Sequence, residues 1–188
     1  NAGEIENRGF ETVLNVTPIQ NEGGFNWDLT ANFATNNNEV VRLHESLQSI
    51  VLGSFWRLSV EAREGEPYGA LVGYANQRTD DGRMLIGDDG YPMRTDELQV
   101  LGHYQPDWTG GLRSTFRYGG VDFSALVDVR QGGELFSVTN QWGKYSGVLQ
   151  ETTQGREDGY VYDGVHPDGS ENTTSVPAQS RSEEHTSE

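Results

Sequence analysis

Residues 112–133, LRSTFRYGGVDFSALVDVRQGG, alternate apolar and polar side chains on both sides of the pair Gly119-Gly120. A period of two is typical of a pleated strand, because successive side chains point to opposite faces. Glycine adopts positive φ without steric cost, which suits a tight hairpin turn. The stretch therefore predicts two antiparallel strands joined by a two-residue turn, with the apolar side chains on one face except for Leu126.

The same alternation occurs in four segments of the chain, residues 10–18, 25–33, 108–118 and 121–130. Each has about 9 to 11 residues, the length that a tilted strand needs to cross a membrane. Short turns join the first two and the last two, whereas about seventy residues separate the second from the third. Aromatic residues lie mainly near the strand ends. Toward the long loops these are Phe10, Phe33 and Trp108, and toward the turns Phe25, Trp27, Phe116 and Tyr118.

The composition excludes several classes of protein to which this chain could belong. Of the 188 residues 34% are hydrophobic, and no apolar run approaches the ~18 residues of a spanning helix. A net charge of −16 argues against nucleic acid and anionic lipid headgroups as partners. The absence of cysteine excludes disulfides, zinc-thiolate sites and thiol nucleophiles. Alternation alone fits either a membrane β-barrel or a soluble β-sandwich, and the unequal loops and the aromatic positions favour the barrel.

Within the region between residues 36 and 106, the turns TDDGR and GDDGYP around the short apolar MLI, with EPYGALVGY ahead of them, predict an irregular hairpin outside any membrane. Whether it adds two further membrane strands or none stays open. Residues 136–156 could include a short helix, although two glycines oppose it.

The ordered motifs resemble the C-terminal half of the barrel of SusC/RagA-type TonB-dependent receptors of Bacteroidetes. The residues that carry the resemblance are NAGEIENRGFE, FNWDLTANFATNNNEVVRL, EGEPYGALVGY, LGHYQPDWTGGLRSTFRYGGVDFSALVDVRQGGELFS and DGVHPDGSENT. The resemblance implies an all-β fold, a partial antiparallel transmembrane β-barrel with long extracellular loops, in the outer membrane. It also implies import of oligosaccharides or peptides, a SusD-like surface lipoprotein as a lid, and a TonB complex that contacts parts of the protein absent here.

The resemblance covers most of residues 1–180, which we interpret as a fragment of a barrel without its plug or closing strands. The last eight residues, RSEEHTSE (181–188), resemble one translated frame of a sequencing adapter. We therefore expect them to be a non-native tail.

The resemblance also predicts which face of the sheet carries the charged residues of the strands. If the apolar set faces lipid, the polar face lines a wet lumen, where opposite charges on neighbouring strands can pair. The predicted lumen-facing residues are Arg113, Arg117, Asp122, Asp128 and Arg130.

The best candidates for ligand contact are aromatic residues after the fourth strand, because rings with polar tips stack on sugar or peptide while partly wet. They are Trp142, Tyr145, Tyr160 and Tyr162, and packing within the loop is an equal alternative.

We predict no enzyme, no cofactor and no metal site. The chain lacks nucleophile-elbow and phosphate-loop motifs, and its histidines lack metal-ligand spacing. The acidic turns with Asp80, Asp81, Asp88 and Asp89, and with Asp163, Asp168 and Glu171, are expected to be solvated; calcium binding is the minor alternative. A secreted β-sandwich that binds carbohydrate is the competing function, with glycoside hydrolysis third.

Overall fold

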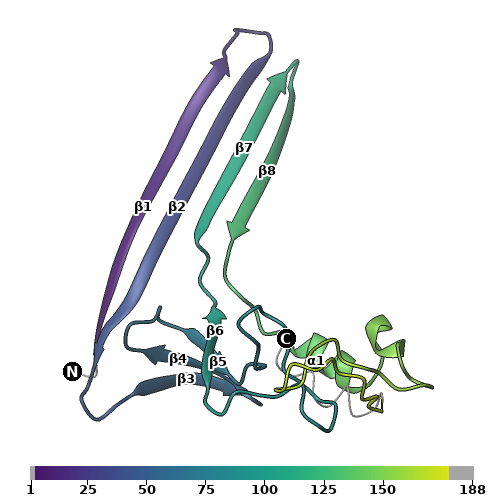
Figure 1. Ribbon diagram of the computed structural model, residues 1–188. Helices are drawn as coiled ribbons and strands as arrows, with labels where there is room; N and C mark the ends of the chain where they lie inside the picture. Colours follow the sequence, from purple (N-terminus) through teal and green to yellow (C-terminus); the bar gives the residue numbers. More distant parts are fainter. Residues whose placement is uncertain (1–2, 178–188) are drawn as a thin grey trace. The chain divides into compact units, whose positions relative to one another are not determined.

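The computed structural model describes residues 3–177, and the alternating segments form strands in it (Figure 1). In chain order the elements are β1 (Gly3–Ile19), β2 (Asn26–Leu43), β3 (Ser49–Phe55), β4 (Leu58–Arg63), β5 (Ala70–Gly73), β6 (Gln99–His103), β7 (Trp108–Tyr118), β8 (Val121–Gln131), α1 (Val138–Tyr145) and the 3₁₀ helix η1 (Gln150–Thr153). The strands make two four-stranded sheets, β1-β2-β7-β8 and β3-β4-β5-β6. The described residues are thus mainly β, as predicted.

Two compact units divide the described chain. The first contains the long sheet β1-β2-β7-β8 with Glu61–Ala70 and Gly102–Glu134. The second contains Leu52–Val60, Leu71–Leu101 and the described residues from Leu135 onward.

The turn between β7 and β8 is the two-residue hairpin that the sequence predicts. Tyr118 pairs with Val121, and the intervening Gly119 and Gly120 have φ of 57° and 81°. Positive φ at both central positions matches the right-handed twist of the flanking strands. This turn fixes the register, so Leu112 lies opposite Val127 and Phe116 opposite Phe123.

The first hairpin is longer than predicted. β1 has 17 residues and β2 has 18, against an expected length of 9 to 11. The additional pairs run from Gly3 opposite Leu43 to Gly9 opposite Asn36. Most side chains of this extension are polar, so the apolar alternation that marks a strand in the sequence is missing there, although the backbone ladder continues.

The middle region does not enter the long sheet. β2 pairs directly with β7, from Asn26 opposite Arg117 to Ala34 opposite Thr109. Residues 49–103 instead supply β3 to β6, which the sequence analysis did not identify as strands. The predicted irregular hairpin is present as isolated bridges, such as Arg78–Met84 and Ile86–Pro92. The predicted short helix is confirmed as α1, whose N-cap Ser137 accepts a hydrogen bond from Asn140 N.

The long sheet is open within the described residues, with β1 and β8 at its edges. A closed barrel is therefore not formed by this part of the chain. Each unit has a small core of its own. In the first unit Val40, Leu43 and Ala62 are buried together, and in the second Ile86, Tyr162 and Val176. Neither cluster lies on the apolar face described next.

Candidate functional site: a two-faced sheet, its loops and their clefts

The long sheet carries its apolar side chains on one face. In an antiparallel pair, directly opposite residues share a face. Leu29 lies opposite Val16 on one side and Ser114 on the other, and Leu112 lies opposite Ala31 and Val127. Little covers this face in the described residues, since Val127 is 59% exposed. The alternation read from the sequence is thus one continuous apolar surface across four strands.

Two sets of aromatic rings mark the ends of this face. Near the turns, Phe116 stacks with Phe25 and Trp27 at centroid distances of 5.9 Å, and with Phe123 at 6.2 Å. Near the long loops, Phe33 stacks with Trp108 at 5.8 Å. Five of the seven rings that the sequence placed at strand ends therefore meet across strands, and they form two aromatic borders.

A polar residue on the apolar face, Ser114, has a hydrogen-bond partner. Ser114 Oγ accepts a hydrogen bond from the indole Nε1–H of Trp27, at 2.8 Å. The indole N–H would otherwise have no acceptor among apolar side chains.

The opposite face is polar, and it includes all five predicted lumen residues. Arg113, Arg117, Asp122, Asp128 and Arg130 alternate with the apolar set in β7 and β8. Arg117 forms an ion pair with Asp28 of β2, and Asp28 also accepts a hydrogen bond from Thr17 Oγ1 of β1 at 2.8 Å. Charges on neighbouring strands therefore pair as expected here. That this face lines a lumen stays a prediction.

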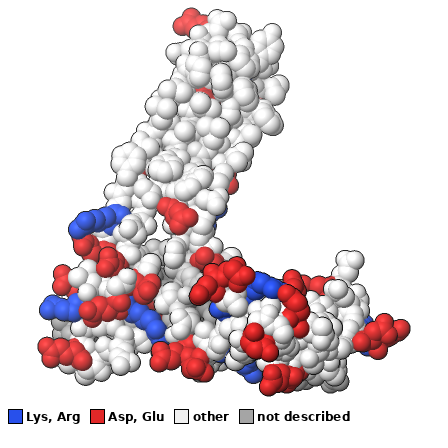
Figure 2. Space-filling model, in the orientation of Figure 1, with Lys and Arg blue, Asp and Glu red and all other residues white. Residues whose placement is uncertain are grey.

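Charged side chains are unevenly distributed over the surface shown in Figure 2. On this side, the part of the long sheet that lies toward its turns is almost free of Lys, Arg, Asp and Glu, whereas both colours are frequent around the loops and the second sheet. The pattern matches a surface that avoids water over part of the sheet and meets water elsewhere.

Two of the four predicted loop aromatics form an exposed cluster. Trp142 and Tyr145 of α1 meet at 5.5 Å in a T-shaped contact. A third ring, Trp56 from the turn between β3 and β4, meets Trp142 at 5.2 Å. The sequence analysis missed Trp56, because it lies 86 positions before Trp142 along the chain. We call Trp56, Trp142 and Tyr145 the aromatic cluster.

Trp56 has an unusual backbone. It has φ of 56°, the only positive φ among the described residues that are not glycine, and its side chain is 62% exposed. A bulky residue rarely adopts this conformation, which costs about 1–2 kcal/mol. Residues with this kind of backbone strain cluster at functional sites.

The other two predicted aromatics have a different environment. Tyr160 and Tyr162 meet at 5.1 Å, and Tyr162 is 5% exposed in the core of the second unit. Their arrangement favours packing, so we carry the ligand-contact prediction forward for Trp142 and Tyr145.

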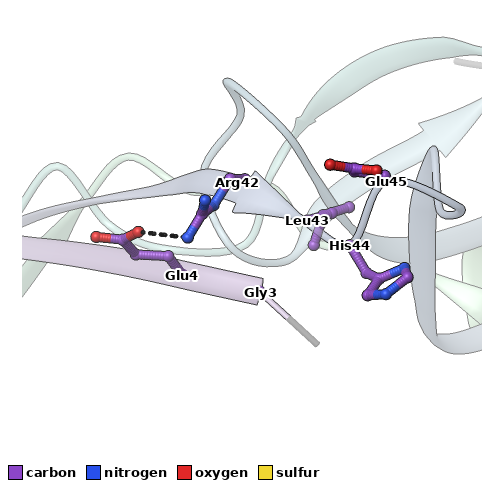
Figure 3. Close-up of a pocket in the computed structure, with 6 residues that line it drawn as sticks. All are labelled: Gly3, Glu4, Arg42, Leu43, His44 and Glu45. Carbon is purple, nitrogen blue, oxygen red and sulfur yellow. Dashed lines mark ion pairs between the residues drawn. The ribbon is translucent and has the colours of Figure 1, made fainter. Parts of the chain in front are cut away.

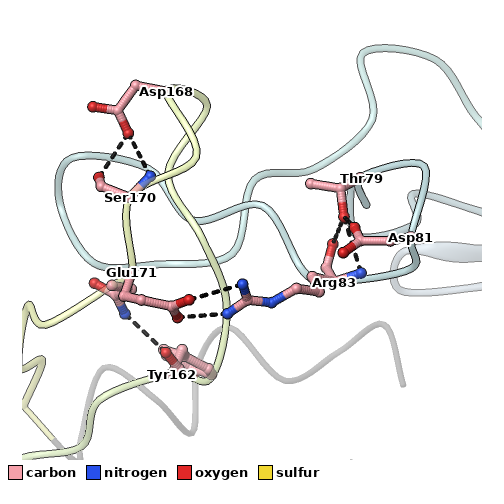
Figure 4. A network of polar contacts seen from close by, with 8 residues as sticks. Thr79, Asp81, Arg83, Tyr162, Asp168, Ser170 and Glu171 are labelled. Atoms are coloured by element: carbon pink, nitrogen blue, oxygen red, sulfur yellow. Dashed lines mark hydrogen bonds and ion pairs between the residues drawn. The ribbon is translucent and has the colours of Figure 1, made fainter.

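The acidic turns are held by local hydrogen bonds and one ion pair (Figure 4). Arg83 donates to both carboxylate oxygens of Glu171, at 2.8 and 2.5 Å, which lowers the pKa of Glu171 and raises that of Arg83. The Ser170 hydroxyl and backbone N–H donate to Asp168 and lower its pKa, and the Thr79 hydroxyl does so for Asp81. No group of three or more His, Cys, Asp or Glu in residues 3–177 is arranged to hold a metal ion.

Several clefts open near the long-loop ends of the first unit. One, of about 510 Å³, is lined by Gly3, Glu4, Arg42, Leu43, His44 and Glu45 (Figure 3). An ion pair in its lining joins Glu4 to Arg42 at 3.5 Å, with both side chains largely exposed. The second cleft, of about 340 Å³, lies beside Asn36–Asn38 of β2 and residues 103–107.

Among the described residues, no helix combines the length and the apolar character that crossing a membrane requires.

Comparison with known proteins gives one consistent result. No protein-family model matches the chain. It is 28% identical over 162 residues to "TonB-dependent receptor P3" of Formosa agariphila and 27% identical over 165 residues to "TonB-dependent receptor P26" of the same organism. These alignments cover 74% and 73% of the chain but only 16% of each relative. "TonB-dependent receptor P39" is 37% identical over 76 residues, 40% of the chain and 7% of that relative.

The fold also matches part of a solved structure, "Structure of the RagAB peptide transporter", with a TM-score of 0.60 at 18% sequence identity. The match covers 94% of this chain and 20% of that one. The resemblance predicted from the motifs is confirmed: in sequence and in fold, the chain is similar to one segment of a SusC/RagA-type TonB-dependent receptor.

Proposed function

We propose that this chain is a segment of an outer-membrane TonB-dependent transporter that imports oligosaccharides or peptides together with a SusD-like surface lipoprotein. It performs no bond-making chemistry. The observation that carries the proposal is the two-faced long sheet, apolar on one face and polar on the other across all four strands.

In this proposal the apolar face contacts lipid, and the polar face lines the lumen. Trp108 and Phe116 are eight residues apart on β7, about 27 Å along the strand at ~3.4 Å per residue. At a strand tilt of about 40° this is about 20 Å along the membrane normal, close to the ~25 Å apolar band of β-barrels. The two aromatic borders would then lie at the two interfaces.

The soluble β-sandwich is less compatible with this surface. In a sandwich the apolar face packs on a second sheet and becomes the core. Here Phe123, Val127 and Val129 are exposed, and the buried clusters of both units lie elsewhere.

The remaining parts of the transporter would come from the rest of the receptor, because the chain spans about a sixth of its first two relatives. Further strands would pair with the edges of β1 and β8 and so satisfy their backbone groups in lipid. The plug and the TonB contact would also lie outside this segment. The aromatic cluster would contact substrate or the lid lipoprotein.

The proposal is tested with nitroxide labels in the complete receptor, reconstituted in lipid vesicles. Labels at Leu29 and Val127 are expected to collide with oxygen dissolved in the bilayer, and labels at Thr30 and Asp128 with a water-soluble nickel complex. The two pairs are neighbours in sequence on opposite faces of the same strands, so each is the control for the other. Aqueous collisions at Leu29 and Val127 would refute the membrane segment.

Transport itself is tested by uptake in a bacterial host. Radiolabelled neutral oligosaccharides and peptides are supplied to cells with the complete receptor, with and without a functional TonB complex. Accumulation that requires both the receptor and TonB supports the proposal. Equal accumulation without TonB contradicts it.

A further inference from the structure

The second sheet, β3-β4-β5-β6, has two edges within the described residues, the strands β3 and β6. An edge strand carries a row of backbone N–H and C=O groups without partners on one side, and other extended segments pair with it readily. Native proteins protect exposed edges with charged side chains, proline, bulges or a covering segment. The two edges of this sheet differ in that protection.

The edge of β6 is closed at its end by Glu134. The backbone N–H of Glu134 donates to the carbonyl of His103 at 2.8 Å, and the Glu134 carboxylate accepts from His103 N at 2.8 Å. These are the backbone groups through which His103 would pair with a further strand. Gly102 makes room for this contact, because a Cβ at that position would lie 2.6 Å from the carboxylate carbon of Glu134.

The edge of β3 has no such protection. No charged residue and no proline lies between Glu45 and Arg57. Beyond the strand ladders, no backbone hydrogen bond within residues 3–177 involves Ser49–Phe55. Val51 is 58% exposed and its neighbour Leu52 is 40% exposed, although successive side chains point to opposite faces. The strand therefore exposes apolar side chains on both faces together with its backbone edge.

The position of β3 is fixed before any partner arrives. Ile50 packs against the core cluster of the first unit. At the other end of the strand, the two residues Trp56 and Arg57 join β3 to β4. A two-residue hairpin turn needs positive φ at its first position, and Trp56 has φ of 56° there. The tight turn holds β3 against β4, so the free edge is a preformed template for strand addition.

The partner that fits this edge is an extended, uncharged segment with apolar side chains. Its backbone would bond to every second residue of β3, and its side chains would pack beside those of Val51 and Leu52. A charged side chain opposite these residues would meet no counter-charge, because β3 carries none. The chemistry of β3 thus selects a strand like itself.

Three sources could supply such a strand: the rest of the receptor, a separate lipoprotein or a peptide in transit. The chain spans about a sixth of its first two relatives, so most of the polypeptide of the receptor lies outside it. A segment of the same polypeptide keeps a high effective concentration and loses no translational freedom when it pairs. A peptide in transit must also leave again, which continuous pairing along β3 opposes.

We propose that a strand from another part of the complete receptor pairs with β3 and adds a fifth strand to the four of the second sheet. The pairing would satisfy the free backbone groups of β3 and cover part of its exposed apolar surface. This inference goes beyond the proposed function and depends neither on lipid contact nor on the substrate.

The test is hydrogen exchange of the complete receptor, purified in detergent without lipoprotein or peptide. Mass spectrometry with electron-transfer fragmentation resolves single amides. In an open edge, every second amide of β3 exchanges near its intrinsic rate. With an added strand we expect every amide from Ile50 to Ser54 to exchange about a hundredfold or more below its intrinsic rate. Alternating fast and slow amides would overturn the inference. Protection that appears only after lipoprotein or peptide is added would also overturn it, and would assign the edge to that partner.

Two substitutions of the same kind separate strand pairing from a general effect of charge. Val51→Lys places a charge within the paired edge, whereas Leu47→Lys places one in the connection before β3, where the side chain is 42% exposed. We expect the amides of residues 50–54 to exchange about tenfold faster or more in Val51→Lys and at the wild-type rate in Leu47→Lys. Unchanged protection of β7 and β8 would show that both variants are folded. If Val51→Lys left the amides of β3 unaffected, no strand would cover them.

This inference and the membrane assignment fail in different ways. Labels that report lipid at Val127, with alternating exchange in β3, remove the added strand and leave the transporter. Aqueous surroundings at Val127, with uniform protection of β3, remove the membrane segment and leave the extended sheet.

Discussion

Trp27 on β2 donates its indole N–H to Ser114 Oγ on β7, over a distance of 2.8 Å, within the apolar face of the long sheet. The hydroxyl is one of the few polar groups on this face, and it lies diagonally across from the tryptophan. In lipid, a lost acceptor cannot be replaced by water. Ser114 therefore allows an aromatic residue with a polar tip to border the apolar surface.

Replacing Ser114 with alanine is expected to destabilise the complete receptor by about 1–2 kcal/mol, because the Trp27 N–H loses its acceptor. The measurement is guanidinium unfolding in detergent micelles. Ser124→Ala, which removes a hydroxyl bonded to Thr115 on the polar face, is the control and is expected to cost less. Equal losses in the two variants would contradict the assignment of the faces.

Two adjacent residues on β8 give a sharper test of which face of the long sheet contacts lipid. Leu126 lies on the polar face opposite Arg113, and Val127 on the apolar face opposite Leu112. Arginine on a lipid-facing position near mid-membrane costs about 2–4 kcal/mol. Val127→Arg is therefore expected to lower the amount of heat-resistant folded receptor in outer-membrane fractions, and Leu126→Arg to leave it close to wild type. The reverse order would place lipid on the other face.

The ion pair between Arg83 and Glu171 makes local stability depend on pH. Arg83 lowers the pKa of Glu171, so the folded loop binds this proton less readily than the unfolded chain does. The stabilisation is complete above the ordinary glutamate pKa of about 4.3 and is lost as the pH falls through the lowered value. Glu171→Gln is expected to speed amide hydrogen exchange in residues 83–86 and 164–172 at pH 7. Near pH 2 the exchange rates of the variant are expected to equal those of wild type.

Hydrogen exchange followed by mass spectrometry measures this difference, after correction for intrinsic rates at each pH. Glu157→Gln is the control, because Glu157 is an exposed acidic residue of the same unit. If Glu171→Gln raised exchange equally at both pH values, the charge of Glu171 would not be the cause.

Because the backbone of Trp56 is strained, the effect of replacing Trp56 on stability is expected to depend on its neighbour Trp142. Trp56→Gly relieves about 1–2 kcal/mol of strain at φ of 56° but loses a ring contact with Trp142 worth about 0.5–1.5 kcal/mol. The single variant is expected to be nearly neutral. In a Trp142→Ala background, where the contact is already absent, Trp56→Gly is expected to stabilise by about 1 kcal/mol. Thermal unfolding of all four proteins completes the cycle, and equal effects in both backgrounds would show that the rings do not couple.

The strands of the long sheet could be predicted from sequence, because their pattern is local and repeated. Phe116, Val127 and Leu29 each belong to an unbroken alternation, and Gly119-Gly120 marks the turn. The strands β3 to β6 could not be predicted in this way. Their residues lie in short mixed segments, such as Ala70–Gly73, which is buried throughout and therefore does not alternate.

In the candidate site, too, sequence predicted the features that follow from a local pattern and missed those that depend on distant contacts. The five charged residues of β7 and β8 share a face because the period of two requires it, so sequence was sufficient. Sequence could not bring Trp56 to Trp142, or Thr35 to Asp107, because these pairs depend on how distant segments pack. For the same reason sequence grouped Tyr162 with Trp142, although the structure buries the first and exposes the second.

By itself, the sequence determined which side chains alternate and where the tight turn lies, and hence that the long sheet has one apolar and one polar face. The tertiary structure decided that β2 pairs with β7, that the middle region forms a separate sheet, and that Thr35 binds the carbonyl of Asp107 where β2 and β7 part. The physical reason is the range of the forces involved: side-chain direction follows from each residue's own backbone, whereas strand order and clefts depend on contacts between residues far apart in the chain.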